Sequence, residues 1–191
     1  MFSEVSLISF EMCLPIEEHA LTVMTWRNDP TTLSMSFHRG PKLWETFWPE
    51  FQETYFLNPP ELHPVFALLE GRRIGFLKFN PVPHPLGLPR LTVDISINIA
   101  PAFRAKGLGR KVIAASLEHL RTRGVGSVFA EVLAHNEASI KSFTAVGFMP
   151  IGTSDKLNPD TRETDHVHQF VAELAAGVGG ADGGSSRDAK T

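Results

Sequence analysis

Hydrophobic and polar residues recur along the chain with spacings that predict its secondary structure. The clearest pattern of period two lies in residues 91–99, which we expect to form a strand. Branched aliphatic side chains occupy one face of this strand and polar side chains occupy the other. The aliphatic residues are Val93, Ile95, Ile97 and Ile99, and the polar residues are Asp94, Ser96 and Asn98. One face therefore packs in a core, whereas the other faces polar surroundings.

Similar patterns predict six further strands, in residues 3–12, 65–70, 74–79, 127–133, 148–152 and 165–174. Helical spacing predicts helices in residues 16–24, 41–57, 107–123 and 137–146. Residues 80–90 are proline-rich and are expected to form a loop. This order predicts one α/β (α+β) domain over residues 1–174, with a mixed central sheet flanked by about four helices. The glycine-rich residues 175–191 lack aromatic residues and are expected to form a disordered tail.

The expected helix 41–57 carries more aromatic residues than one core-facing stripe needs. Leu43, Phe47 and Phe51 follow helical spacing, and Trp44 and Trp48 lie one position further round. Two interpretations stay open: a helix packed on both sides, or a wall of a ligand pocket.

Composition and charge narrow the class of protein. The chain has 191 residues, is 42% hydrophobic and carries a formal net charge of -3. This charge argues against a broad nucleic-acid surface, and the sequence contains neither a signal-peptide pattern nor the ~20 consecutive apolar residues of a membrane span. The single cysteine, Cys13, excludes an internal disulfide. We therefore expect a cytoplasmic protein without a nucleic-acid or membrane partner.

Candidate chemistry lies where the strand at 91–99 leads through a glycine-containing turn into a helix. Backbone N–H groups at a helix N-terminus lack intrahelical partners and attract anions, and Gly107 and Gly109 leave them accessible. Arg104, Lys106 and Arg110 add positive charge. These features predict a pyrophosphate-binding loop. A Rossmann fingerprint is excluded because valine stands at position 112 where that pattern needs glycine, and a Walker motif is absent.

Two motifs resemble those of the GNAT superfamily of acetyl-CoA-dependent N-acetyltransferases. R-x-x-G-x-G at residues 104–109, after a strand, is similar to motif A of that family. Asn136 and Ser139, followed by Phe143 and Gly147-Phe148, resemble its next motif. Together the motifs cover residues 91–150, and the first 90 residues match only in the order of their elements.

The resemblance implies a GNAT-like fold with an acyl-CoA site at a splay between two parallel strands. Backbone groups of the first strand would pair with the pantetheine arm, and the amides of residues 105–110 would hold the pyrophosphate. The residues assigned to acetyl-CoA are Ile97, Asn98, Ile99, Arg104, Ala105, Lys106, Gly107, Leu108, Gly109, Arg110, Asn136 and Phe143. No metal is expected, because His166 and His168 have no third ligand at a fitting spacing.

The resemblance also implies direct attack of a neutral amine on the thioester, which requires a base. We expect Glu131 in this role, with Asp94 as the second candidate. Histidines near the sheet are further candidates, and they are His135, His166 and His168. Many family members protonate the leaving thiolate with a tyrosine at the position of Phe143, which has no hydroxyl. Ser142 or water would then replace it, since the only tyrosine is Tyr55.

The acceptor is expected to be a primary amine on a small molecule. Trp26, Arg27 and Asn28 are similar to an element of a subgroup that acetylates amino sugars on nucleotide carriers, so an amino-sugar nucleotide is one candidate. Arg27 suits a phosphate or carboxylate, or alternatively a surface ion pair with Asp29 or Glu18. Two other functions stay open: acetylation of protein or peptide N-termini, and acyl-CoA sensing without catalysis. A homodimer also stays open.

Overall fold

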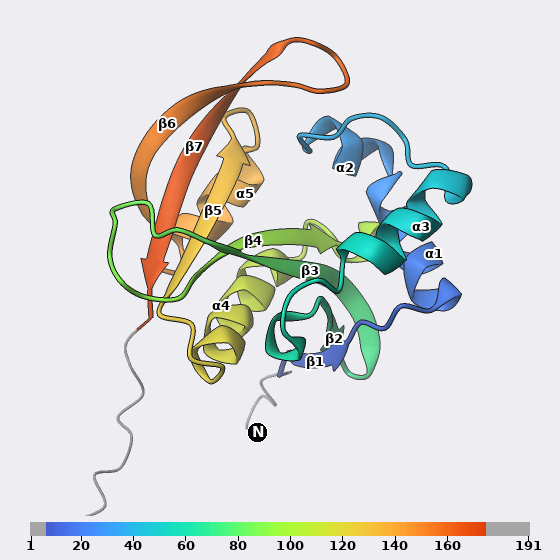
Figure 1. Ribbon diagram of the computed structural model, residues 1–191, viewed down its shortest axis with the longest axis horizontal. Helices are drawn as coiled ribbons and strands as arrows, with labels where there is room; N and C mark the ends of the chain where they lie inside the picture. The colour runs from blue at the N-terminus through green and yellow to red at the C-terminus, as the bar shows by residue number, and fades with distance from the viewer. Residues whose placement is uncertain (1–6, 175–191) are drawn as a thin grey trace, which may run out of the picture.

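A seven-stranded mixed sheet forms the centre of the chain in the computed structural model, which describes residues 7–174 (Figure 1). Its strand order is β1-β2-β3-β4-β5-β7-β6, and all neighbours are antiparallel except β4 and β5, which are parallel. The strands are β1 (Ser9–Met12), β2 (Val65–Leu69), β3 (Arg72–Val82), β4 (Thr92–Ile99), β5 (Ser127–Leu133), β6 (Met149–Leu157) and β7 (Thr164–Glu173). The predicted mixed sheet is confirmed, and residues 175–191 lie outside the described part.

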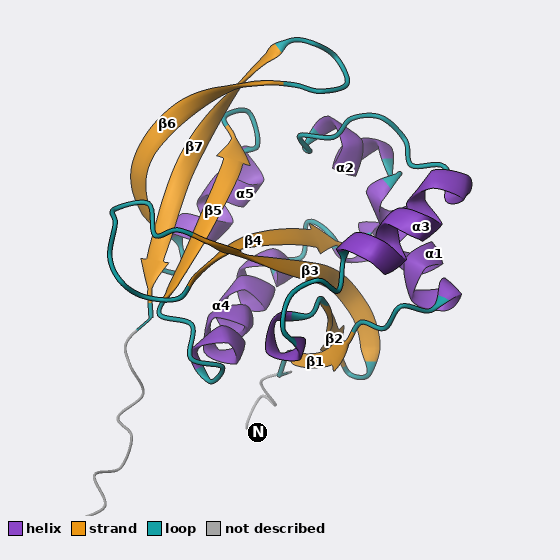
Figure 2. Cartoon of the chain, in the orientation of Figure 1, coloured by secondary structure: helices purple, strands orange, loops and turns teal. Residues whose placement is uncertain are grey.

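Five α-helices flank this sheet (Figure 2). They are α1 (Glu17–Arg27), α2 (Pro30–Ser34), α3 (Trp44–Thr54), α4 (Leu108–Arg121) and α5 (Glu137–Thr144), with short 3₁₀ turns at η1 (Pro60–Leu62) and η2 (Pro101–Phe103). The sequence analysis missed α2, whose five residues are too few to show periodicity. Pro30 begins this helix, which Asp29 caps by accepting a hydrogen bond from the Thr32 N–H at 3.1 Å.

The expectation that residues 80–90 form only a loop is wrong at its start, because β3 continues to Val82. Pro81 lies opposite Val93 in the pairing of β3 with β4. The pairing of β3 with β2 has already ended at Leu77, so one edge of β3 is free at this point. A proline fits there because its missing N–H is not required by a neighbouring strand. Strand β6 is also longer than predicted, since its polar second half forms an edge strand.

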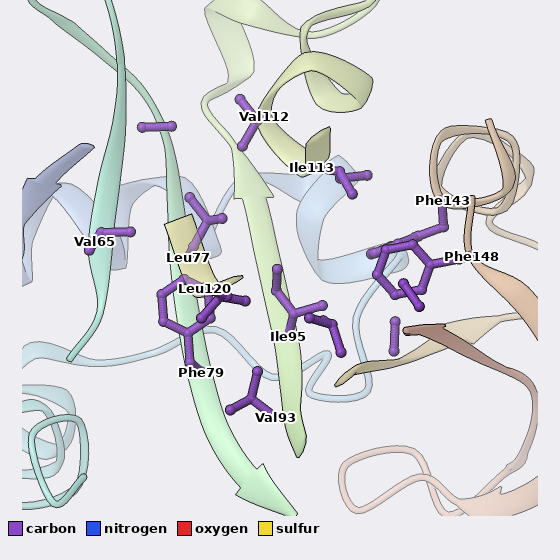
Figure 3. Packing of buried hydrophobic residues seen from close by; sticks show 14 of the residues in the cluster. Val65, Leu77, Phe79, Val93, Ile95, Val112, Ile113, Leu120, Phe143 and Phe148 are labelled. Atoms are coloured by element: carbon purple, nitrogen blue, oxygen red, sulfur yellow. The ribbon is translucent and has the colours of Figure 1, made fainter. Parts of the chain in front are cut away.

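Two hydrophobic clusters hold the layers together. The larger cluster lies between the sheet and the helices α4 and α5; Val93 and Ile95 of β4 meet Val112 and Ile113 of α4 there (Figure 3). The smaller cluster joins α1 and α3 to β2 and β3. Its centre is aromatic and fully buried, and at its edge the rings of Trp44 and Trp48 stack 5.4 Å apart. The aromatic residues of α3 therefore serve packing, which decides between the two interpretations of this helix.

The parallel strands β4 and β5 pair over only three residues, from Thr92 opposite Ser127 to Asp94 opposite Phe129. Beyond this point the strands diverge, as Figure 2 shows. The described residues give no pairing between β4 after Asp94 and β5 after Phe129. This divergence confirms the predicted splay and leaves two strand edges open to a ligand.

Candidate active site

A cavity of about 880 Å³ lies at the splay. Its walls come from β4, β5, the loop that leads into α4, and the segment 31–42 that contains most of α2. Among the predicted cofactor residues, those that line it are Ile97, Asn98, Ile99, Arg104, Ala105, Gly107, Leu108, Gly109, Asn136 and Phe143. The structure thus brings together the two motifs that the sequence analysis joined by resemblance.

The loop before α4 has the backbone shape of an anion-binding site. Ala105 and Gly107 both have left-handed backbone, with φ of 57° and 70°, and Gly107 is the N-cap of α4. A Cβ atom at Gly107 would meet nothing within 4 Å, so glycine is required here by conformation and not by space. Within the described residues, the N–H groups of residues 105–110 donate to no backbone or side-chain acceptor. A diphosphate fits this set of unpaired donors.

The charged side chains of the same loop are placed differently from the expectation. Arg104 donates to the Asp29 carboxylate, to the Thr32 hydroxyl and to the Ile99 carbonyl, the last at 3.0 Å. Its guanidinium therefore joins the loop to the start of α2. The Lys106 and Arg110 side chains are exposed and do not line the cavity, so their predicted contact with the cofactor would be made by their backbone N–H groups and stays a prediction.

The second motif lies across the cavity. Asn136 caps α5, where its side chain accepts a hydrogen bond from the Ser139 N–H at 3.2 Å. The Ser142 hydroxyl lines the cavity and donates to the carbonyl of Ala138 at 2.8 Å. Phe143 packs edge-to-face on Phe148, with ring centroids 4.9 Å apart (Figure 3). Its ring is therefore both a core residue and part of the cavity wall.

Two carboxylates, Asp94 and Glu131, face the cavity from β4 and β5. The pKa of Asp94 is raised to about 6: burial and, after it, the nearby Glu131 charge raise it, and Lys156, Asn80 and Lys78 oppose them. A carboxyl with this pKa is a base that titrates just below neutrality.

The Glu131 carboxylate is held by two neighbouring side chains. One of its oxygens forms an ion pair with Lys156, and the other accepts a hydrogen bond from Gln169 at 3.1 Å. Both Glu131 oxygens are thus occupied by neighbours on β6 and β7, whereas the Asp94 carboxylate forms no ion pair within residues 7–174. The geometry favours Asp94, the second candidate of the sequence analysis.

Of the three predicted acceptor-binding residues, only Arg27 lines the cavity. Trp26 packs on the ring of Phe66 at 6.0 Å. Asn28 exchanges two hydrogen bonds with the backbone of Lys42, at 2.7 and 2.8 Å. Trp26 and Asn28 do not line the cavity and their side chains contact other parts of the fold, so their role in acceptor binding stays a prediction. Asn28 has an indirect part, since it positions Lys42.

Two lysines of the cavity wall, Lys42 and Lys78, were missed. Lys78 had a signal in the sequence, because it is the only charged residue between Ile74 and Phe79 in a strand that is otherwise apolar. Lys42 had none, because its place depends on Asn28, which lies 14 residues earlier in the chain.

The segment 37–40 bridges the cavity to the β6–β7 hairpin. The Asp160 carboxylate accepts hydrogen bonds from the N–H groups of Arg39 and Gly40, at 2.6 and 2.9 Å. Arg39 also pairs with Asp165, and the Asn158 amide donates to the Phe37 carbonyl at 3.0 Å. These contacts join the loop after Asp29 to the final hairpin.

Other candidates lie outside the cavity. His135, His166 and His168 do not line it, and Tyr55 is buried in the aromatic cluster, where burial raises its pKa. Cys13 is fully buried, which raises its pKa to about 12. Among residues 7–174, no group of three or more His, Cys, Asp or Glu side chains is arranged to hold a metal ion. None of the helices in that range is long and apolar enough to cross a membrane.

Comparisons with known proteins connect this cavity to a family. The model of the Acetyltransferase (GNAT) family matches residues 22–148. An N-acetyltransferase of Streptomyces griseus is 26% identical over 73% of this chain and 74% of its own length. A mycothiol acetyltransferase of Nocardia farcinica is 43% identical over 28% of this chain, a match that spans only 18% of that protein.

Solved structures share the fold. A ribosomal-protein-alanine N-acetyltransferase from Brucella melitensis superposes with a TM-score of 0.66 at 19% identity, over 87% of this chain and 99% of that one. The aminoglycoside acetyltransferase AAC(6')-Ib, solved with an aminoglycoside and acetyl-CoA, gives 0.68 at 17% identity, over 89% and 95% of the two chains. These likenesses concern the fold, and the acceptors of the two proteins differ.

Proposed function

The chain belongs to the GNAT family of acetyltransferases, and on this premise we propose that it transfers the acetyl group of acetyl-CoA to a primary amine of a small molecule. The observation that carries the proposal is the position of Asp94. This carboxyl, with a pKa of about 6, lies in the cavity where β4 and β5 separate, and the loop of unpaired N–H groups opens into the same cavity. A base and an acyl-carrier site in one cavity are the parts that amine acetylation requires.

The residues present fit acetyl-CoA. The N–H groups of residues 105–110 would hold its diphosphate, and the open edge of β4 at Ile97 to Ile99 would pair with its pantetheine arm. The Nδ2 atom of the Asn98 side chain is buried without a hydrogen-bond partner, so it supplies one more donor there. When bound, the thioester supplies an activated acyl group.

Asp94 would accept the proton that the acceptor amine must lose. Its raised pKa brings it close to working pH, and its ionised form prevails above pH 6. Glu131 would hold Lys156 and raise the pKa of Asp94 through its charge. Backbone N–H groups near Ile97 would stabilise developing negative charge on the acyl oxygen. Ser142 lies close to Gly109, 3.8 Å from the position of an added Cβ, and is the hydroxyl available for the leaving sulfur.

The bridge between the segment 37–40 and the β6–β7 hairpin supports a small acceptor. A protein N-terminus would need an open groove between these two elements, and the bonds to Asp160 and from Asn158 connect them. An amino-sugar nucleotide is one candidate of suitable size, since its phosphates would meet the cationic wall of the cavity.

Binding of acetyl-CoA is the first test, by calorimetry on the native chain, Gly107→Trp and Gly87→Trp. Both glycines have positive φ and space for a Cβ, so Gly87→Trp controls for backbone strain away from the site. We expect a dissociation constant on the order of micromolar for the native chain and Gly87→Trp, and no detectable binding for Gly107→Trp. Absence of binding by the native chain would contradict the proposal.

Thiol release in the presence of amines tests the reaction. Small amines and a set of peptides with free N-termini would be compared at saturating acetyl-CoA. We expect release with small amines and only background release with peptides. Faster turnover of peptides would favour the N-terminal alternative, and binding without any turnover would favour an acyl-CoA sensor.

A further inference from the structure

Three cations from separate segments line the same cavity. They are Arg27 at the end of α1, Lys42 before α3 and Lys78 on β3. Arg27 and Lys78 lie over the ring of the same residue, Tyr55, at 5.7 and 4.3 Å from its centroid. The buried ring thus holds two positive groups at one place.

Negative charge in the protein does not balance this cluster. Lys42 pairs with Glu50 at 2.9 Å, but among the described residues no carboxylate lies within 4 Å of the charged groups of Arg27 or Lys78. The Nε atom of Arg27 is buried and has no hydrogen-bond acceptor. A buried donor without a partner is costly, so a ligand atom that accepts from it would be favoured.

The surface ion pairs that would explain Arg27 more simply are already taken. Asp29 pairs with Arg104, and Glu18 pairs with Arg73 at 2.7 Å. Burial lowers the pKa of Lys78, and the positive charges of Arg27 and Lys42 lower it further. Glu50 and Asp94 raise this pKa and so offset part of the repulsion among the three cations, and an anion in the cavity would offset more of it.

We propose that Arg27, Lys42 and Lys78 bind an oxyanion, a carboxylate or a phosphate, that the acceptor amine itself carries. This proposal rests on the proposed function, because it assumes that the cavity takes the acceptor. Lys78 lies opposite Ser96 in the sheet and Asn80 lies opposite Asp94, so the cluster and the base share one face, roughly 7 Å apart along the strands. An acceptor held by its oxyanion would present its amine to Asp94.

Matched acceptors test this on the native chain. β-Alanine would be compared with β-alaninamide for the carboxylate, and O-phosphoethanolamine with ethanolamine for the phosphate, by thiol release at saturating acetyl-CoA. We expect kcat/KM to be higher by about 10-fold or more for at least one anionic member, the usual effect of a charged hydrogen bond. The pair with the larger ratio identifies the oxyanion. Equal kcat/KM within both pairs would overturn the proposal.

Variants locate the effect in the cluster. Arg27→Gln and Lys78→Met would be compared with Lys111→Met, which removes an exposed lysine of α4 outside the cavity. We expect the ratio of kcat/KM for the anionic acceptor to that for the neutral acceptor to fall to about one in the first two variants, through a higher KM for the anionic acceptor. The control should keep the preference. A preference that persists in folded Arg27→Gln and Lys78→Met would overturn the assignment.

A binding measurement separates this inference from the proposed function. Inorganic phosphate and succinate would be titrated by calorimetry into the chain saturated with CoA, which fills the amide loop. We expect saturable binding of at least one anion, lost in Arg27→Gln and retained in Lys111→Met. If no amine is acetylated, the proposed function fails, yet this titration still shows whether Arg27, Lys42 and Lys78 bind an anion. Absence of binding of both anions would overturn the inference.

Discussion

The two ends of the cavity present different kinds of atoms to a ligand. At the cofactor end, the available groups are backbone N–H donors of residues 105–110 and the open edges of β4 and β5. At the acceptor end, they are the side chains of Arg27, Lys42 and Lys78. The first set depends on the local path of the chain. The second depends on contacts between segments far apart in the sequence, such as Lys78 over Tyr55.

The two ends should respond differently to amino-acid substitution. Backbone donors persist under most substitutions, provided that Gly107 can keep its positive φ. Side-chain donors change identity with each substitution. One scaffold can therefore keep its acyl carrier while its acceptor varies, in line with the different acceptors named for the structures that share this fold.

Asp94 lies where the two ends meet, and its replacement should have the largest effect. We expect Asp94→Asn to lower kcat by about 10²- to 10⁴-fold, the usual contribution of a general base. The limb of the pH profile with a midpoint near pH 6 should disappear with it. Thiol release from pH 5 to 9 measures both. Asp155→Asn, which alters an exposed carboxylate of β6, is the control and should keep the limb.

Asp94→Asn should raise the stability of the chain at pH 8, although it lowers kcat. The pKa of Asp94 rises from 3.8 to about 6 on folding, so the folded chain holds this proton more tightly than the unfolded chain. The associated stability is present below pH 4 and is lost as the pH rises through 6. Asp94→Asn removes a buried charge, so its Tm should exceed that of the native chain at pH 8 and not at pH 4. A lower Tm at pH 8 would indicate a structural role for Asp94.

Much of the cofactor end could be predicted because its signals are contiguous. The period-two pattern at 91–99 placed Asp94 and Asn98 on one face, and the glycines after it marked the turn into α4. The hydrophobic pattern predicted all seven strands, with errors at their ends where Pro81 occupies a free edge.

The acceptor end and the order of the two carboxylates could not be predicted in the same way. Asp29 meets Arg104 across 75 positions, and Lys156 occupies Glu131 across 25. Neither contact follows from residue types or local spacing. Without the Lys156 contact, the sequence analysis ranked Glu131 above Asp94 as the base.

Arg104 joins the two ends, and its loss should have the next largest effect. Arg104→Met breaks the bonds to Asp29, Thr32 and the Ile99 carbonyl. We expect the free energy of unfolding to fall by about 1–3 kcal/mol and the KM of the acceptor to rise by about 10-fold, since α2 loses its anchor. Denaturant titration and steady-state kinetics measure these. Arg110→Met removes an exposed charge nearby and is the control. If it lowered the free energy of unfolding as much as Arg104→Met, the loss of charge and not the loss of the anchoring bonds would explain the result.

Glu131→Gln should have a smaller effect that separates the two carboxylates. The Glu131 charge raises the pKa of Asp94, and Lys156 lowers it. Neutralising Glu131 leaves Lys156 unopposed, so the midpoint near pH 6 should move to lower pH. At pH 8, where Asp94 is ionised in either case, kcat should fall less than about 10-fold, below the range for a lost base. A fall of 10²-fold or more with an unmoved midpoint would instead make Glu131 the base.

Phe143→Tyr should have the smallest effect, although it restores the residue that many family members carry. A thiol has an ordinary pKa of ~8.5, so the CoA sulfur departs readily as a thiolate and should gain less than about threefold in kcat at pH 8. The Phe143 ring already packs on Phe148, so the added hydroxyl must face the cavity or lose its hydrogen bonds to water. Thiol release at pH 6–9 and Tm measure the two outcomes. A gain in kcat above 10-fold would mean that protonation of the leaving sulfur limits the rate. Side chains at the cofactor end, and not only those at the acceptor end, would then alter the activity.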